Sequence, residues 1–161
     1  MKWKRAFLAL DFGTSNVHVT LVDGDTAEMI LGTSRKYRWY TPGPNEIELN
    51  AEEVWKASET AVEELMRKLP ENLELLAVTF SFFGDSITPV DKDGNALYAM
   101  LPGFCGRSRS EVELMDKEIG AQEYARITGN TLSTLSSVSK ILWLKRHRPE
   151  VFKKAYAFYS N

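Results

Sequence analysis

Residues 6–22 of the chain read AFLALDFGTSNVHVTLV, and they predict a strand, a polar turn and a second strand. The apolar run 6–10 is bounded by charged residues, which is typical of a buried strand. Residues 11–16 are polar and contain a glycine, so they predict a turn. Residues 17–22 alternate in character and are rich in β-branched side chains, which indicates a second strand. The chain is therefore predicted to begin with a hairpin that has a polar turn.

The elements after this hairpin predict a mixed sheet. A third strand is expected over 27–31. Asn50 and Glu53 form a capping box for a helix that Pro70 ends. The apolar run 73–80 then predicts a fourth, central strand. Hairpin strands followed by a helical crossover make a mixed sheet, so the predicted fold class is α/β.

The remaining sequence predicts a second hairpin and several short helices. The turn 91–94 is expected to join strands over 87–90 and 96–100. Local signals place the later elements as follows: a helix that starts at Ser110 with Glu113 as its capping partner, a helix over 123–127 that Gly129 ends, a helix from Val138 to about His147, a short helix from Pro149, and a strand near 156–159.

Composition is ordinary for a globular protein and limits the expected partners. Of 161 residues, 43% are hydrophobic and 26% are charged, and 20 basic against 22 acidic residues give a net charge of −2. Nucleic acid is not an expected partner, because there is no basic excess to neutralise phosphates, and no apolar run is long enough to predict a membrane span. The single cysteine, Cys105, cannot form an internal disulfide, which fits a cytoplasmic protein, and it is expected to be a small buried residue. Trp55 and Trp143 lie in predicted helices and are expected in the core.

The turn DFGTS at 11–15 has groups that suit a metal-bound polyphosphate. Asp11 offers a carboxylate oxygen to Mg²⁺, directly or through a water molecule. Gly13 lets the backbone approach a ligand closely, and Thr14 and Ser15 add short donors. The spacing is not that of a P-loop, and a tight polar hairpin without a ligand is the alternative.

A second alternative for this turn is an aspartic-type protease. That chemistry needs two acids that share one proton, each followed one residue later by Gly and then Thr or Ser. A homodimer would supply the second acid, although Phe12 is bulkier than the residue usual at its position.

The order of motifs resembles the amino-terminal part of the FGGY carbohydrate kinases, the group with xylulokinase, gluconokinase and glycerol kinase. Residues 8–15 are similar to the family's first phosphate motif, and residues 46–55 resemble a stretch that reads roughly W-x-E-Q-D-P-x-x-W. Residues 80–97 resemble the first sugar-contacting loop and the hairpin after it. Residues 127–130 and 140–150 resemble the I-T-G-N and K-L-L-W-L-K…P-E segments, so the resemblance covers nearly the whole chain.

This resemblance implies a fold and a reaction. The fold would be ribonuclease-H-like, as in actin and hexokinase: a mixed sheet with flanking helices, with residues 1–161 forming part of an amino-terminal sugar-binding domain. The reaction would transfer the γ-phosphoryl group of Mg-ATP to a hydroxyl of a pentulose or a sugar acid, so that the sugar and ATP are the partners. The catalytic base and the main nucleotide site are expected beyond Asn161, and the chain alone is expected to be inactive.

The resemblance also implies roles for individual residues. The turn 11–15 would hold Mg²⁺ and approach the transferred phosphate. Gly84 and Asp85 fall where relatives contact the sugar, and Asp85 is suited to accept hydrogen bonds from neighbouring hydroxyls. Arg107 matches the arginine of a W-x-D-x-R pattern and is expected to bind substrate. Cys105 stands at the aspartate of that pattern, and a thiol does not replace a carboxylate as an acceptor for hydroxyls.

The main alternative to a kinase is a non-catalytic module that binds a sugar or a partner chain. A homodimer is compatible with each of these functions, and the sequence does not name the sugar.

Overall fold

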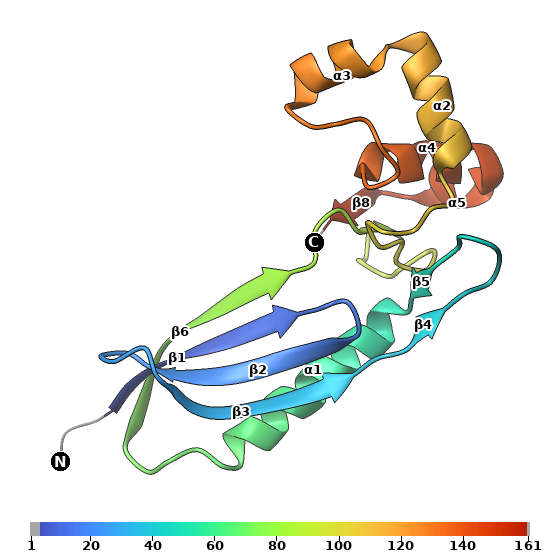
Figure 1. Cartoon of the computed structure of the whole chain (residues 1–161). Coiled ribbons are helices and arrows are strands. Elements are labelled where there is room, and N and C mark those ends of the chain that lie inside the picture. The colour runs from blue at the N-terminus through green and yellow to red at the C-terminus, as the bar shows by residue number, and fades with distance from the viewer. Residues whose placement is uncertain (1–3, 161) are drawn as a thin grey trace. The chain divides into compact units, whose positions relative to one another are not determined.

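The computed structural model describes residues 4–160, which divide into two compact units (Figure 1). The first unit comprises the chain through Arg38 and residues 52–83, and the second comprises residues 39–51 and the chain from Gly84 onward. The backbone therefore passes from the first unit to the second, back again, and then to the second once more, and each unit has its own strand pairing.

The first unit is a four-stranded mixed sheet with a long helix along one face (Figure 1). Its strand order is β3-β2-β1-β6, in which β2 is antiparallel to β1 and β3 and β6 is parallel to β1. The elements are β1 (Lys4–Phe12), β2 (Asn16–Asp23), β3 (Met29–Lys36), α1 (Ala51–Met66) and β6 (Leu73–Phe82). The predicted order of hairpin, third strand, helix and parallel strand is confirmed.

Alternation of apolar side chains explains why β1 and β2 form the centre of this sheet. Every second residue of β1 from Ala6 to Phe12 is buried, and so are Val17, Val19 and Leu21 of β2. Helix α1 buries a stripe that includes Val54, Ala61 and Leu65. The Thr33 hydroxyl donates to the Ala61 carbonyl at 2.9 Å, which ties β3 to this helix.

Two predictions in the first unit are wrong. The strand β6 was expected at the centre of the sheet, but within residues 4–160 it lies at the edge and pairs only with β1. Its large side chains, Phe80 and Val78 among them, are consequently exposed. Trp55 is 60% exposed, because it follows Val54 directly and points off the buried stripe of α1.

The second unit consists of short strand pairs and four helices around a small apolar core. The strand pairs are β4 (Trp39–Tyr40) with β5 (Glu48–Leu49), and β7 (Ile87–Val90) with β8 (Ala157–Ser160). The helices are α2 (Arg109–Glu118), α3 (Ala121–Thr128), α4 (Ser137–His147) and α5 (Pro149–Lys154). Ile87, Leu101, Trp143 and Leu144 form the buried cluster.

Most local predictions for the second unit are confirmed, including the left-handed Gly129 that ends α3 at φ 73° and Pro149 at the start of α5. Two are wrong. Residues 96–100 form isolated bridges, Ala96 to Val90 of β7 and Met100 to Leu49 of β5, and the ladder partner of β7 is β8. The N-cap of α2 is Ser108, not Ser110, and its hydroxyl bonds instead to the Ser139 hydroxyl at 2.8 Å. Among the described residues no helix is long and apolar enough to cross a membrane.

Candidate functional site

The predicted phosphate turn lies between β1 and β2 in the first unit. Asp11 is an exposed residue of β1, paired with His18 across the hairpin. The Gly13 amide donates to the Asn16 carbonyl at 2.9 Å, which closes the turn. Within residues 4–160 the Asp11 carboxylate has no hydrogen-bond or ion-pair partner, and Ser15 is also exposed. The acid therefore stands next to a tight turn with its oxygens available.

Tyr37 supports this turn, and the sequence did not point to it. Its hydroxyl donates to the Gly13 carbonyl, and its amide donates to the Ser15 carbonyl at 3.1 Å. Tyr37 is 8% exposed; burial, with a smaller contribution from the Asp11 charge, raises its pKa to about 12. The phenol therefore stays protonated and keeps donating at neutral pH. Residues 37 and 13 lie 24 positions apart, so no local signal links them.

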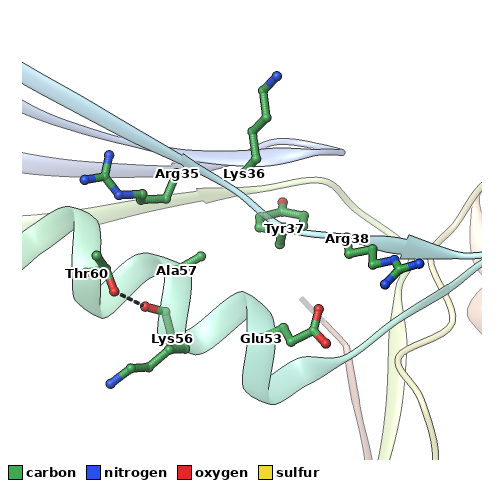
Figure 2. A pocket seen from close by; sticks show the side chains of 8 residues that line it. All are labelled: Arg35, Lys36, Tyr37, Arg38, Glu53, Lys56, Ala57 and Thr60. Atoms are coloured by element: carbon green, nitrogen blue, oxygen red, sulfur yellow. Dashed lines mark hydrogen bonds between the residues drawn. The ribbon is translucent and has the colours of Figure 1, made fainter.

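The ring of Tyr37 also borders a hollow of about 530 Å³ between the end of β3 and α1. Arg35, Lys36 and Lys56 give this hollow a basic lining. Figure 2 shows that the charged ends of these side chains point in different directions, and Arg35 pairs with Glu64. The lining charges do not converge on a common point, as they would around a bound anion. None of the predicted site residues lines this hollow.

The predicted sugar loop lies at the start of the second unit. Gly84 and Asp85 are both outside the core, and Asp85 has a left-handed backbone with φ 61°, which is uncommon for a residue other than glycine. Gly103 packs directly against this loop: a Cβ at Gly103 would come within 2.9 Å of the Gly84 carbonyl oxygen and 3.2 Å of the Asp85 Cβ. The glycine at 103 thus permits the close approach that holds Asp85 in place.

Asp85 lines a pocket of about 500 Å³ in the second unit. The other lining residues come from α3, from the start of α4 and from the loop between these helices, and most of them carry hydroxyl or amide groups: Tyr124, Thr128, Asn130, Thr131, Ser133, Leu135, Ser136, Ser137 and Val138. The pocket was not predicted as a unit, although residues 127–130 were singled out by their pattern.

Lys140 fixes the loop that forms one wall of this pocket. The residue is fully buried in α4, and its ammonium donates to the carbonyls of Thr134 and Leu135 at 2.7 and 3.0 Å. Burial lowers the pKa of Lys140 to about 8, and electrostatic interactions with Cys105 and Asp85 oppose this lowering. Its sequence neighbours are mostly apolar, so nothing local indicated this role.

Arg107 lies among protein groups rather than in the pocket beside Asp85. Its side chain is 1% exposed, and its Nη2 lies 2.8 Å from a Glu48 carboxylate oxygen. Its Nε lies 3.1 Å from the Cys105 sulfur, and its guanidinium stacks 4.7 Å above the Trp143 ring. The structure thus brings Asp85 together with the polar pocket, and it gives Arg107 a separate set of partners. Cys105 is fully buried, as expected.

Acidic, histidine and cysteine side chains do not gather into a metal centre in the part of the chain that the structure describes. A magnesium ion at Asp11 would therefore be held by one carboxylate and complete its shell with water and ligand oxygens. This arrangement is common for Mg²⁺, which often binds proteins through one or two carboxylates together with phosphates.

The family model described as "FGGY family of carbohydrate kinases, N-terminal domain" matches residues 6–160. The chain belongs to this family. It is 24% identical over 151 residues to the xylulose kinase of Staphylococcus xylosus, covering 94% of this chain and 31% of the relative. It is 24% identical over 148 residues to the gluconokinase of Bacillus subtilis, covering 92% and 28% of the two chains.

Solved structures confirm the fold. The xylulose kinase of Rhodospirillum rubrum superposes with a TM-score of 0.90 at 22% identity, over 96% of this chain and 32% of that chain. The expected α/β fold of the sugar kinases is therefore confirmed. The chain spans less than a third of the curated relatives above, at 31% and 28% of their lengths. These matches favour the kinase interpretation, and none of them supports the protease alternative.

Proposed function

We propose that this chain forms the amino-terminal, sugar-binding part of an ATP-dependent kinase that phosphorylates a hydroxyl of a pentulose or a sugar acid. One observation carries this proposal within the family: the Asp11 carboxylate stands without a protein partner among residues 4–160, beside a turn that Tyr37 holds in shape.

The turn between β1 and β2 is proposed to meet the transferred phosphate. Asp11 fits Mg²⁺ bound directly or through a water molecule, and bound Mg²⁺ would neutralise charge on the ATP phosphates. Gly13 allows the backbone to come close to an anion, and Thr14 and Ser15 offer donors next to it. The protein's own contribution here is positioning, because phosphoryl transfer depends mainly on alignment and charge stabilisation.

The second unit is proposed to bind the sugar. Asp85 accepts hydrogen bonds from sugar hydroxyls, and Gly84 allows the sugar to approach the backbone. Arg107 is proposed to support substrate binding indirectly, because its buried side chain contacts both Glu48 of β5 and Cys105. Since the chain covers 31% of the first relative, the catalytic base and the adenosine site are proposed to lie outside these 161 residues.

The test is a phosphoryl-transfer assay on the gene product purified from its native cells, together with its intact mass. We expect sugar-dependent ADP formation from Mg-ATP by a protein heavier than 18.3 kDa, and no turnover by the 161-residue chain alone. Absence of ADP formation with every ketopentose and sugar acid tried would contradict the proposal. A gene product of 18.3 kDa would require a second chain to supply the ATP site.

A further inference from the structure

Hydrogen bonds from two directions hold the backbone of the turn between β1 and β2. Within the hairpin, the Gly13 amide donates to the Asn16 carbonyl at 2.9 Å. From the end of β3, the Tyr37 hydroxyl donates to the Gly13 carbonyl and the Tyr37 amide donates to the Ser15 carbonyl at 3.1 Å. Tyr37 therefore binds the turn through one side-chain donor and one backbone donor. A substitution of its side chain removes the first donor and keeps the second.

The side-chain bond fixes the direction of the peptide group between Gly13 and Thr14. The described residues contain no cis peptide bond, and in a trans peptide the C=O and N–H groups point to opposite sides. A Gly13 carbonyl that is held by the Tyr37 hydroxyl therefore aims the Thr14 N–H away from Tyr37. Gly13 has no side chain to restrict its own backbone, so this orientation depends on a partner outside the turn.

The donor and the acid of the turn belong to one local arrangement within the first unit. Tyr37 is 8% exposed, so water has little access to compete for its hydroxyl bond. The Asp11 charge contributes to the raised pKa of Tyr37, so the phenol and the carboxylate lie within electrostatic range of each other. A change in the Tyr37 hydroxyl bond is therefore a change next to the acid that is proposed to hold Mg²⁺.

We infer that Tyr37 is a positioning residue for phosphoryl transfer, because its hydroxyl sets the direction in which the turn presents its backbone to the transferred phosphate. The inference rests on the proposed function and adds to it a residue that acts through the turn rather than by contact with a ligand. Phosphoryl transfer depends mainly on alignment, so a looser turn slows the chemical step. Sugar affinity stays the same, because the sugar is proposed to bind the second unit.

The first experiment measures the order parameter of the Thr14 amide by ¹⁵N relaxation of the labelled 161-residue chain. We expect a value of about 0.85 in the wild type, as for a rigid backbone, and a lower value in Tyr37→Phe, which keeps the ring and the backbone donor. The matched control Tyr156→Phe removes a hydroxyl from a residue that is 76% exposed in the second unit, and it should leave Thr14 unchanged. Retained dispersion of the amide spectrum checks that each variant is folded.

The second experiment measures steady-state kinetics of the native gene product. Tyr37→Phe should lower kcat per folded enzyme about two- to tenfold, the range for one hydrogen bond, and should leave the KM for the sugar unchanged. Circular dichroism under the assay conditions gives the folded fraction. This correction separates slower chemistry from a loss of folded protein, which a merely structural role of Tyr37 would cause.

Three results would overturn the inference: a Thr14 amide that is already flexible in the wild type, a Thr14 order parameter that is unchanged in Tyr37→Phe, or an unchanged kcat per folded enzyme. The first of these is measured on the wild type and does not depend on the folding of a variant. Turnover together with any of these results would reject the role of Tyr37 and leave the proposed function standing. Absence of turnover in the wild-type gene product would reject the proposed function, and the inference with it.

Discussion

Replacing Lys140 by methionine should remove a pH-dependent part of the stability of this chain. Lys140 is fully buried, and its pKa is lowered from 10.5 to about 8 by that burial. A tenfold loss of proton affinity on folding corresponds to roughly 1.4 kcal/mol, so the buried ammonium costs the folded state about 3 kcal/mol at neutral pH.

Proton binding sets the sign of this effect. Between about pH 8 and 10.5 the unfolded chain keeps a proton on Lys140 that the folded chain has released. The free energy of unfolding therefore rises with pH, by about 2 kcal/mol between neutral pH and roughly pH 9.5. Methionine has no proton to release, so the Lys140→Met variant lacks this rise. Its loss of the donors to Thr134 and Leu135, about 1–3 kcal/mol for each unsatisfied carbonyl, does not change with pH.

Urea denaturation of the wild-type chain and of Lys140→Met, followed by circular dichroism at a series of pH values, measures this difference. Other groups titrate in both proteins and cancel when the two curves are subtracted. The free energy of unfolding of the wild type minus that of Lys140→Met should increase as the pH rises. Parallel curves across this range, or movement in favour of the variant, would refute the argument that burial depresses the pKa of Lys140.

Three further predictions concern the turn and the sugar loop. In the native gene product with kinase activity, Asp11→Asn should lower kcat by about 10²- to 10³-fold with little change in sugar affinity. Steady-state kinetics measures both quantities, and an unchanged kcat would reject the proposed role of Asp11. Tyr37→Phe removes the hydroxyl bonded to the Gly13 carbonyl and should destabilise the chain by about 1–2 kcal/mol in urea denaturation, whereas no loss would mean that water replaces the phenol. Gly103→Ala places a methyl group within 2.9 Å of the Gly84 carbonyl oxygen and should lower the free energy of unfolding by about 1–3 kcal/mol. Wild-type stability in urea denaturation would mean that the loop shifts to accommodate the methyl group without cost.

Local patterns predicted the elements whose neighbours are close in sequence. The hairpin of β1 and β2 follows from alternation and from the polar turn between them. The end of α3 follows from Gly129, because its left-handed conformation suits a residue without a side chain. The exposure of Trp55 could also have been predicted from the sequence, because the buried stripe of α1 runs through Val54 and Ala61 and leaves position 55 outside it. The position of a residue around the helix axis, rather than its hydrophobicity alone, decides whether its side chain is buried.

Long-range pairing is what the sequence could not predict. The ladder of β7 joins Ile87 to Ser160, and nothing in the stretch 87–101 indicates that distant partner. The edge position of β6 depends likewise on which strands are available to pair with it. For the candidate site, the polar turn was predictable from its residue types, but its support by Tyr37 comes from beyond the end of another strand.

The cysteine at position 105 shows how the second unit balances the charge of Arg107 without the aspartate of the related pattern. The Cys105 sulfur accepts from the Arg107 Nε at 3.1 Å and from the Ile47 amide at 3.4 Å, and it lies 3.8 Å from the Asn45 carbonyl oxygen. The positive charge of Arg107 is paired with Glu48, whose carboxylate oxygen lies 2.8 Å from the Arg107 Nη2. A buried arginine without such a carboxylate would cost several kcal/mol, and the largely buried Glu48 removes most of that cost. Among the described residues the buried Nη2 of Arg107 makes this ion pair without a well-directed hydrogen bond, so the pairing balances the charge of Arg107 but leaves part of its donor capacity unused.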